Sequence, residues 1–157
     1  PGGPLIDKYA KKGNPTAFKL PKPKVEGLNF SFSGLKTSIR YFIERNKKSN
    51  PDFVKTHLED ICASIQHTIV EILMDKLQTA SMETKIKQVA IGGGVSANSE
   101  IRQRIKACEN ELDWKTFIPK IEYCTDNAAM IGIVGYFKYL KKDFVQADIA
   151  AKARYLL

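Results

Sequence analysis

A predicted strand that runs directly into three glycines is the feature that most constrains this chain. Residues 87–91 end in three apolar residues, which predicts a short buried strand, and the chain then continues as Gly92, Gly93 and Gly94. Three consecutive glycines are costly in folding entropy, so they indicate positive φ or a close approach of the backbone to another group. Ser96 or Asn98 can cap a helix that follows. A strand, a bare turn and a helix N-terminus together form a site for an anionic or nucleotide ligand.

The composition indicates one globular domain with reduced thiols. Of the 157 residues, 43% are hydrophobic, which is enough for a core and too many for a disordered chain. No apolar run approaches the roughly 18 residues of a membrane span, and no signal peptide is visible. Cys62, Cys108 and Cys124 are odd in number and widely spaced, which favours free thiols in a cytoplasmic protein over a disulfide framework or a zinc knuckle.

The net charge of +8 favours an acidic partner such as RNA. In the first 26 residues, only Asp7 and Glu26 oppose six lysines, which are Lys8, Lys11, Lys12, Lys19, Lys22 and Lys24. Lysines also simply keep a surface soluble, and no motif of an RNA-binding fold accompanies them. Charge alone therefore leaves both interpretations open.

Hydrophobic spacing and cap residues predict an α/β fold in which helices cover a small sheet. The almost wholly apolar helix at residues 128–140 is expected to be buried, with Thr125 or Asp126 as its cap. The chain opens with a predicted turn at residues 1–4 and closes with a loop over residues 143–157. Between them we expect a helix at 5–12, a half-buried strand at 28–32, a helix capped by Ser33, a long helix opening at Pro51, a strand at 87–91, a helix at 100–111 and a strand at 116–118.

The glycine turn also has the spacing of the dinucleotide-binding fingerprint, through Gly92, Gly94 and Ala97. Glu111 or Asp113 would be the acid about 20 residues further on. The fit is poor, because Asp113 precedes the next predicted strand and the fingerprint requires the acid at the end of that strand. A tight packing turn between strand and helix explains the glycines equally well.

Two further positions are candidates for ligand contacts. Asp126 stands at a helix N-terminus, where it is either a cap or a carboxylate ligand of a metal ion. A catalytic metal needs about three protein ligands, and His57 and His67 are too far apart in sequence to form a helical pair. If Asp126 binds a metal, its partners are expected outside this chain. Lys36, in the first turn after Gly34, is a candidate anion contact.

Four stretches resemble, in order and in spacing, the TsaD family, formerly called Gcp, YgjD or O-sialoglycoprotein endopeptidase. They are Pro-Gly-Gly-Pro at 1–4, Asn-Phe-Ser-Phe-Ser-Gly-Leu-Lys-Thr at 29–37, Gly-Gly-Val-Ser-Ala-Asn at 93–98 and Tyr-Cys-Thr-Asp-Asn-Ala-Ala-Met-Ile at 123–131. The closing Ala-Arg-Tyr-Leu-Leu resembles the C-terminal end of that family. The resemblance therefore covers essentially the whole chain.

The resemblance implies that residues 1–157 are the C-terminal lobe of an actin-like, Hsp70-like ATPase fold of the ribonuclease H-like type. It implies transfer of a threonylcarbamoyl group from threonylcarbamoyl-adenylate to the adenosine beside the tRNA anticodon, with one bound iron or zinc ion. TsaB-like and TsaE-like proteins would be the partners in a bacterium. By motif match, Gly3 and Asn98 would contact the nucleotide-like substrate, with the glycine turn and Ser96 beside them, and Asp126 would be the one metal ligand from this lobe.

This chain departs from the family pattern in two respects. The His-x-x-x-His metal pair of the family is absent, and so is the acidic segment that precedes Pro-Gly-Gly-Pro. We therefore expect the chain to be the C-terminal part of a longer transferase and to be inactive alone. The alternative is a nucleotide-binding or tRNA-binding interaction module whose basic face docks tRNA. The older metallopeptidase label is poorly supported, because no nucleophile–base pair is visible and two of three metal ligands are missing.

Overall fold

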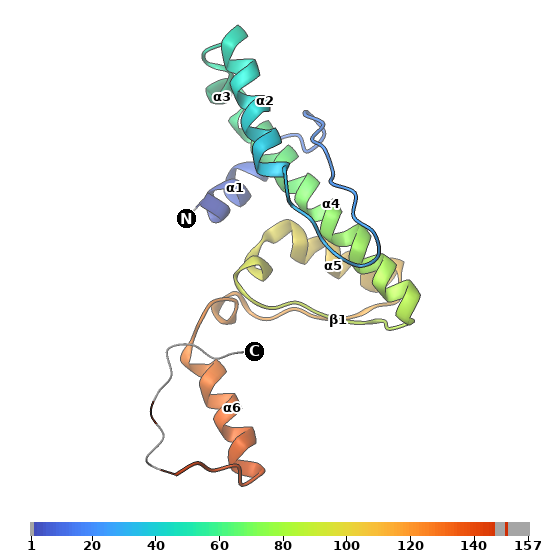
Figure 1. The fold of residues 1–157 in the computed structure, drawn as a ribbon, viewed down its shortest axis with the longest axis vertical. Coiled ribbons are helices and arrows are strands. Elements are labelled where there is room, and N and C mark those ends of the chain that lie inside the picture. The colour runs from blue at the N-terminus through green and yellow to red at the C-terminus, as the bar shows by residue number, and fades with distance from the viewer. Residues whose placement is uncertain (1, 147–149, 151–157) are drawn as a thin grey trace.

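The computed structural model describes residues 2–146 and 150, and it is an α/β structure, mostly helical, with a small sheet (Figure 1). The predicted turn at residues 1–4 is wrong over its described part, because the first helix already begins at Gly2. The loop and extended end predicted for residues 143–157 lie largely outside the described residues. The elements are α1 (Gly2–Ala10), α2 (Leu35–Ser49), α3 (Phe53–Thr56), α4 (Leu58–Thr84), β1 (Gln88–Ala90), the 3-10 helix η1 (Gly94–Ala97), α5 (Ser99–Glu111), β2 (Lys115–Phe117), the 3-10 helix η2 (Ile121–Tyr123) and α6 (Ala128–Leu140).

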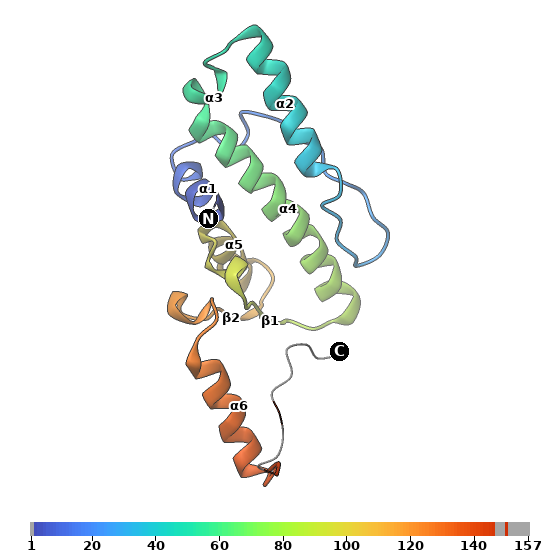
Figure 2. The ribbon, with the colours of Figure 1, turned by 60° about the vertical axis from the view of Figure 1, so that its left-hand side comes forward.

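Helix α4 is the long central element beside which α1, α2 and α5 lie (Figure 2). Its apolar residues recur at helical spacing, and Ile61, Val70 and Met74 are among those that it buries. The single long helix predicted from Pro51 is instead two helices, because His57 has φ −119° and ψ 20° and interrupts the helical backbone. The His57 ring packs against Phe53 with ring centroids 5.0 Å apart, so the interruption is held by aromatic contacts.

The sheet consists of β1 and β2, which pair in parallel, with Val89 opposite Thr116. Val89 points into a core formed with α4 and α5, whereas Gln88 and Ala90 on the other face are exposed. The remaining core members are Val70, Met74, Ile101, Ile105, Cys108 and Trp114. The expectation that helices cover the sheet is therefore correct for one face only. Parallel sheets are normally covered on both faces, so the open face is unusual for this architecture.

The strand predicted at residues 28–32 is wrong. These residues form no strand, and Phe30 is 51% exposed. The apolar alternation has no neighbouring strand to pair with among the described residues, and pairing rather than pattern makes a strand. Ser33 does not cap α2 either. Gly34 occupies that position with φ 78° and no side-chain cap hydrogen bond, a conformation that favours glycine.

The segment between α1 and α2 is a loop that is bonded along the length of α4. The backbone N–H of Asn14 donates to Asp60 Oδ1 over 2.8 Å, and that of Phe18 donates to Ser64 Oγ over 3.1 Å. Further along, Lys22 Nζ lies 2.6 Å from Glu71 Oε2, and Lys76 Nζ donates to the carbonyl oxygens of Val25 (2.7 Å) and Gly27. The loop therefore runs in one fixed register beside the helix.

The hydrogen bond between Lys22 and Glu71 also shifts the titration of both groups. It lowers the pKa of the Glu71 carboxyl, against the opposing effect of burial. The same hydrogen bond raises the pKa of the Lys22 ammonium. Both groups therefore stay charged at neutral pH and tie the loop to α4.

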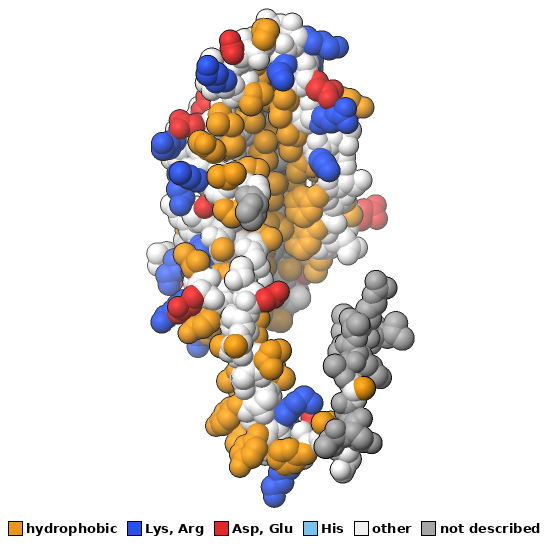
Figure 3. Space-filling view, turned by 90° about the vertical axis from the view of Figure 1, so that its left-hand side faces the viewer, with side chains coloured by type: hydrophobic (Ala, Val, Ile, Leu, Met, Phe, Trp, Pro, Cys, Tyr) orange, Lys and Arg blue, Asp and Glu red, His pale blue; other side chains and the backbone are white. Residues whose placement is uncertain are grey.

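Helix α6 has the predicted bounds but is not buried. All 13 of its residues are exposed, among them Ile131 at 77% and Tyr139 at 67%. In Figures 1 and 2 it projects from the rest of the molecule, and in Figure 3 its surface is mostly hydrophobic. Nothing among the described residues covers it, so the expectation of burial is wrong for this chain. None of the helices in the described part of the chain is long and apolar enough to cross a membrane.

Gly13 lies where the chain leaves α1 and passes the first turn of α4. A Cβ added there would be 2.1 Å from the carbonyl oxygen of Glu59 and 2.7 Å from the backbone nitrogen of Asp60. Both are backbone atoms of a helix, so they cannot move aside cheaply. Glycine is therefore required here by a close approach of two backbone segments.

We predict that Gly13→Ala lowers the free energy of unfolding by about 1–3 kcal/mol, because the added methyl group overlaps the α4 backbone. Urea denaturation followed by far-ultraviolet circular dichroism measures the change. The control is Gly132→Ala in α6, where an added Cβ meets nothing within 4 Å. That change should leave stability unaltered or raise it by about 0.5–1 kcal/mol. Equal effects of the two substitutions would contradict the steric explanation.

Candidate functional site

The candidate site lies at the carboxyl edge of the parallel sheet. Because β1 and β2 run in the same direction, the segments that follow them leave from the same edge. The glycine turn follows β1, and residues 118–127 follow β2. Ligands of open α/β sheets bind outside the carboxyl ends of the strands. The two sequence motifs at 93–98 and 123–131 are therefore brought together by the sheet.

The glycine turn borders open space instead of packed protein. A Cβ added to Gly92, Gly93 or Gly94 would meet nothing within 4 Å. Gly93 has φ 76° and ψ 175°, a region almost confined to glycine, so its own backbone explains this one glycine. Packing does not explain the other two, which disfavours the tight packing turn that the sequence left open.

Ser96 is buried and stabilises this turn from inside. Its hydroxyl donates to the carbonyl oxygen of Gly93 over 2.6 Å, and its residue is 3% exposed. The backbone N–H of Ser96 bonds the same oxygen over 3.0 Å. The turn thus closes as one 3-10 helix, η1, before α5 begins at Ser99.

Asn98 is the N-cap of α5, which confirms one of the two caps that the sequence allowed. Its Oδ1 accepts hydrogen bonds from the backbone N–H groups of Glu100 and Ile101, each over 3.1 Å. Its Nδ2 donates to Gln66 Oε1 over 2.8 Å. An amide carries two N–H groups on Nδ2, so the second N–H is the group that remains for a ligand.

Arg102 joins the two segments at the sheet edge. One guanidinium nitrogen, Nη1, donates to the carbonyl oxygen of Ser96 over 3.0 Å and lies 3.7 Å from Cys124 Sγ. The other, Nη2, donates to the carbonyl oxygen of Pro119 over 2.7 Å. Cys124 is completely buried beside it. The rigid fork of a guanidinium suits this double contact, so Arg102 fixes the spacing between the glycine turn and the residues after β2.

Helix α1 is attached beside the start of α5. Asp7 Oδ1 accepts hydrogen bonds from the Ser99 hydroxyl (2.7 Å) and the Ser99 backbone N–H (3.2 Å). Figures 1 and 2 both show the N-terminal end of α1 on this side of the molecule. Gly3 lies in the first turn of α1, and a Cβ there would meet nothing within 4 Å. Gly3 therefore faces open space.

Asp126 is exposed between η2 and α6 and is not a helix cap. The cap of α6 is Asn127, whose Oδ1 accepts from the Met130 backbone N–H over 3.2 Å. The sequence expectation of Thr125 or Asp126 as the cap is thus wrong by one or two residues. Since capping does not occupy Asp126, its carboxylate is available to bind a ligand. Within residues 2–146 and residue 150, no group of three or more His, Cys, Asp or Glu side chains is placed to hold a metal ion.

The dinucleotide-binding interpretation is not supported by the position of its acid. Asp113 precedes β2, at the amino end of that strand, and pairs there with Lys87 over 3.0 Å. The glycine turn lies at the opposite edge of the sheet. In addition, Gly94 opens a 3-10 helix and not the α-helix that the fingerprint requires.

The other candidate residues have structural surroundings that explain them. His57 packs among aromatic rings, and His67 Nδ1 lies 3.3 Å from Glu100 Oε1. Lys36 is exposed in the first turn of α2. The three cysteines are free and buried, and burial raises the pKa of the Cys62 and Cys108 thiols, which disfavours a nucleophilic thiolate at either position.

Sequence reasoning missed Arg102, Asp7 and Gln66. Each acts through a partner that no local pattern indicates: a backbone carbonyl, a serine and an asparagine amide. The only signal for Arg102 was a cationic residue one turn after a predicted cap, and this is common on exposed helices.

A family model described as TsaD, tRNA N6-adenosine threonylcarbamoyltransferase, matches residues 1–133. A relative of that name from Christiangramia forsetii is 64% identical over 155 residues, which are 99% of this chain and 46% of the relative. The relative from Riemerella anatipestifer is 51% identical over 157 residues, 100% of this chain and 46% of the relative. The relative from Fervidobacterium nodosum is 44% identical over 137 residues, which are 86% of this chain and 40% of the relative. The chain spans a little under half the length of the curated relatives it matches.

We predict that Arg102→Leu lowers the free energy of unfolding by about 2–4 kcal/mol, because the carbonyl groups of Ser96 and Pro119 lose their donor. Hydrogen exchange should increase first in η1 and in residues 118–127. Arg104→Leu is the matched control, since it removes the same charge from the same helix and the Arg104 guanidinium makes no hydrogen bond within the part of the chain that the structure describes. Equal exchange in the two variants would show that Arg102 does not hold the sheet edge together.

Proposed function

This chain belongs to the TsaD family, and on that premise we propose that it is one half of a tRNA N6-adenosine threonylcarbamoyltransferase. The match of the family model over residues 1–133 is the observation that carries this proposal. It confirms the family resemblance of the four sequence motifs. The proposed substrates are threonylcarbamoyl-adenylate and tRNA, the proposed partners are TsaB-like and TsaE-like proteins, and the proposed location is the cytoplasm.

We propose further that residues 1–157 form the C-terminal lobe of the actin-like, ribonuclease H-like fold. The parallel strands, with a glycine turn at their carboxyl edge, support this assignment. So do the open face of the sheet and the exposed apolar surface of α6, because a second lobe would cover such surfaces.

In the proposed reaction, N6 of the adenosine attacks the carbamoyl carbon of threonylcarbamoyl-adenylate. The bond from that carbon to the phosphate oxygen breaks, AMP leaves, and N6 gives up one proton. Gly3 and the glycine turn, Gly92, Gly93 and Gly94, would let the ribose and phosphate approach the backbone closely. The free N–H of Asn98 Nδ2 would donate to the adenylate, and Ser96 and Arg102 would hold the turn in place.

Asp126 is proposed to supply one ligand to a divalent iron or zinc ion. Asp126 is the exposed carboxylate directly before α6, and the described residues offer no complete ligand set around it, so the other ligands would come from outside this chain. When bound, the ion would act as a Lewis acid toward a carbonyl or phosphate oxygen.

A chimeric transferase tests these roles without assumptions about the rest of the protein. In it, this chain replaces the region of the Christiangramia forsetii relative that it matches at 64% identity. The chimeric transferase should transfer the threonylcarbamoyl group to unmodified tRNA when supplied with the required partners. A folded chimera that binds threonylcarbamoyl-adenylate but transfers nothing would contradict the proposed function.

In the chimeric transferase, we expect Asp126→Ala to lower metal affinity by at least about 10-fold and transfer in parallel. The matched control is Glu122→Ala, an exposed acid in η2 four residues earlier, which should leave both unchanged. Metal content by atomic emission and tRNA modification by mass spectrometry measure the two effects. Full metal content and full transfer in Asp126→Ala would show that Asp126 is not a metal ligand.

We also predict that Asn98→Asp raises the KM for threonylcarbamoyl-adenylate roughly 10-fold or more, because it removes the Nδ2 donor and adds a charge beside a phosphate. Aspartate is an equally good helix cap, so thermal stability should change little. Gln66→Met is the control, since it breaks the Asn98–Gln66 hydrogen bond but leaves the amide of Asn98 in place. If the two variants raise KM equally, Asn98 acts through packing and not through the substrate.

A further inference from the structure

The net positive charge of this chain comes from its first third. Residues 1–56 contain twelve Lys and Arg against four Asp and Glu, whereas residues 57–157 contain thirteen of each. The whole net charge of +8 therefore lies on α1, the loop beside α4, α2 and α3. Such an excess of cations attracts a polyanion to this part of the molecule.

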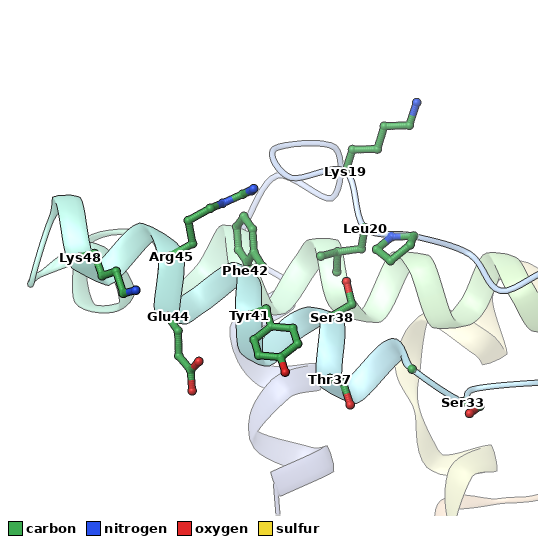
Figure 4. Close-up of a pocket in the computed structure, with 12 residues that line it drawn as sticks. Lys19, Leu20, Ser33, Thr37, Ser38, Tyr41, Phe42, Glu44, Arg45 and Lys48 are labelled. Carbon is green, nitrogen blue, oxygen red and sulfur yellow. The ribbon is translucent and has the colours of Figure 1, made fainter.

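Within this charged part, a groove of about 880 Å³ runs between α2 and residues 19–21 of the loop. In Figure 4, Ser38, Phe42 and Arg45 project from α2 toward Leu20 and Lys19. Leu20 is buried and, with Phe42, forms the apolar part of the wall. The full lining consists of Lys19, Leu20, Pro21, Ser33, Gly34, Thr37, Ser38, Tyr41, Phe42, Glu44, Arg45 and Lys48.

The cations of this groove are not neutralised. Glu44 is its one lining acid, and Arg40 holds that carboxylate with Nε 2.7 Å from Oε1. Among the residues that the structure describes, Lys19, Arg45 and Lys48 have no carboxylate within 4 Å, whereas Lys12 and Lys22 in the same charged part do. Three cationic groups thus remain available to an anionic ligand.

The groove also presents hydroxyl groups and one exposed aromatic ring. Ser33, Thr37 and Ser38 supply hydroxyls, and Tyr41 is 62% exposed. Proteins contact nucleic-acid phosphates through Lys, Arg, Ser and Thr, and they stack unpaired RNA bases on aromatic rings. A carboxylate-rich peptide would use the cations but not the ring.

The walls of the groove are fixed in advance by an aromatic cluster. Phe18 of the loop packs on Phe42 of α2 with centroids 5.1 Å apart, and both contact Phe53, with centroids 5.6 and 5.7 Å away. The loop and α2 therefore hold their separation without a ligand, so binding does not require them to be ordered first.

From these observations we propose that the groove between α2 and residues 19–21 binds an unpaired, single-stranded segment of tRNA. Its phosphates would lie on Lys19, Arg45 and Lys48, and one unpaired base would stack on Tyr41. The identity of the RNA rests on the proposed function, because a transferase of this family must hold a tRNA. The groove is separate from the carboxyl edge of the sheet, so it is a docking site and not the site of transfer.

The test measures the Kd of unmodified tRNA for the chimeric transferase at several salt concentrations. Arg45→Gln with Lys48→Gln should weaken binding at least about 10-fold and reduce the slope of log Kd against log salt by about 1.4, the value for two phosphate contacts on a single strand. The matched control, Lys85→Gln with Lys141→Gln, removes the same charge from exposed positions elsewhere and should change neither quantity.

The aromatic contact has its own test. Tyr41→Leu should weaken tRNA binding several-fold without altering the slope of log Kd against log salt. Tyr41→Phe keeps the ring and should bind tRNA as tightly as the unsubstituted protein. Loss of affinity in Tyr41→Phe equal to that in Tyr41→Leu would show that the ring does not stack on a base.

The outcomes separate this proposal from the proposed function. If the chimeric transferase transfers the group but Arg45→Gln with Lys48→Gln binds tRNA like the control, the groove proposal is wrong and the function stands. If the variant loses tRNA binding but the parent chimera transfers nothing, the groove stands and the function fails. Competition by poly-L-glutamate as strong as that by single-stranded RNA of equal charge would overturn the assignment to RNA.

Discussion

The guanidinium group of Arg102 determines how the candidate site is arranged. The two strands have three residues each, so their few ladder hydrogen bonds alone do not fix the longer segments that leave them. Arg102 donates to the carbonyl of Ser96 on one side and to that of Pro119 on the other. Asp7 then attaches α1 through Ser99, three residues before Arg102. A few polar contacts thus bring together segments that the chain separates by up to 92 residues.

Local patterns predicted the elements that depend on local forces. The bounds of α6 agreed with the prediction, α5 began one residue earlier than predicted, and β1 was one residue shorter at each end. The strand at 28–32 failed because alternation does not supply a partner strand. Burial of α6 failed because an apolar pattern makes a helix suited to burial but does not supply a surface to cover it. Cap assignment succeeded only at Asn98, since a neighbouring polar residue can replace any cap, as Asn127 does.

The candidate site was predictable where a motif follows a strand and unpredictable where a side chain reaches across the fold. Three glycines after a strand indicated the turn, and the structure leaves them facing open space. The role of Arg102 could not be predicted, because its acceptors are backbone carbonyls, which every residue carries. The same holds for the groove beside α2, whose walls are joined by the packing of Phe18 on Phe42 and of both rings on Phe53.

The loop beside α4 has a consequence for how its length can vary. Its attachments at Asn14, Phe18, Lys22 and Val25 meet Asp60, Ser64, Glu71 and Lys76 in the same order along the helix. An inserted or deleted residue would shift every later loop residue away from its partner on α4. Surface loops usually tolerate such changes. Among related proteins, we therefore expect this loop to keep its length, like a helix or a strand, although its exposed side chains can differ.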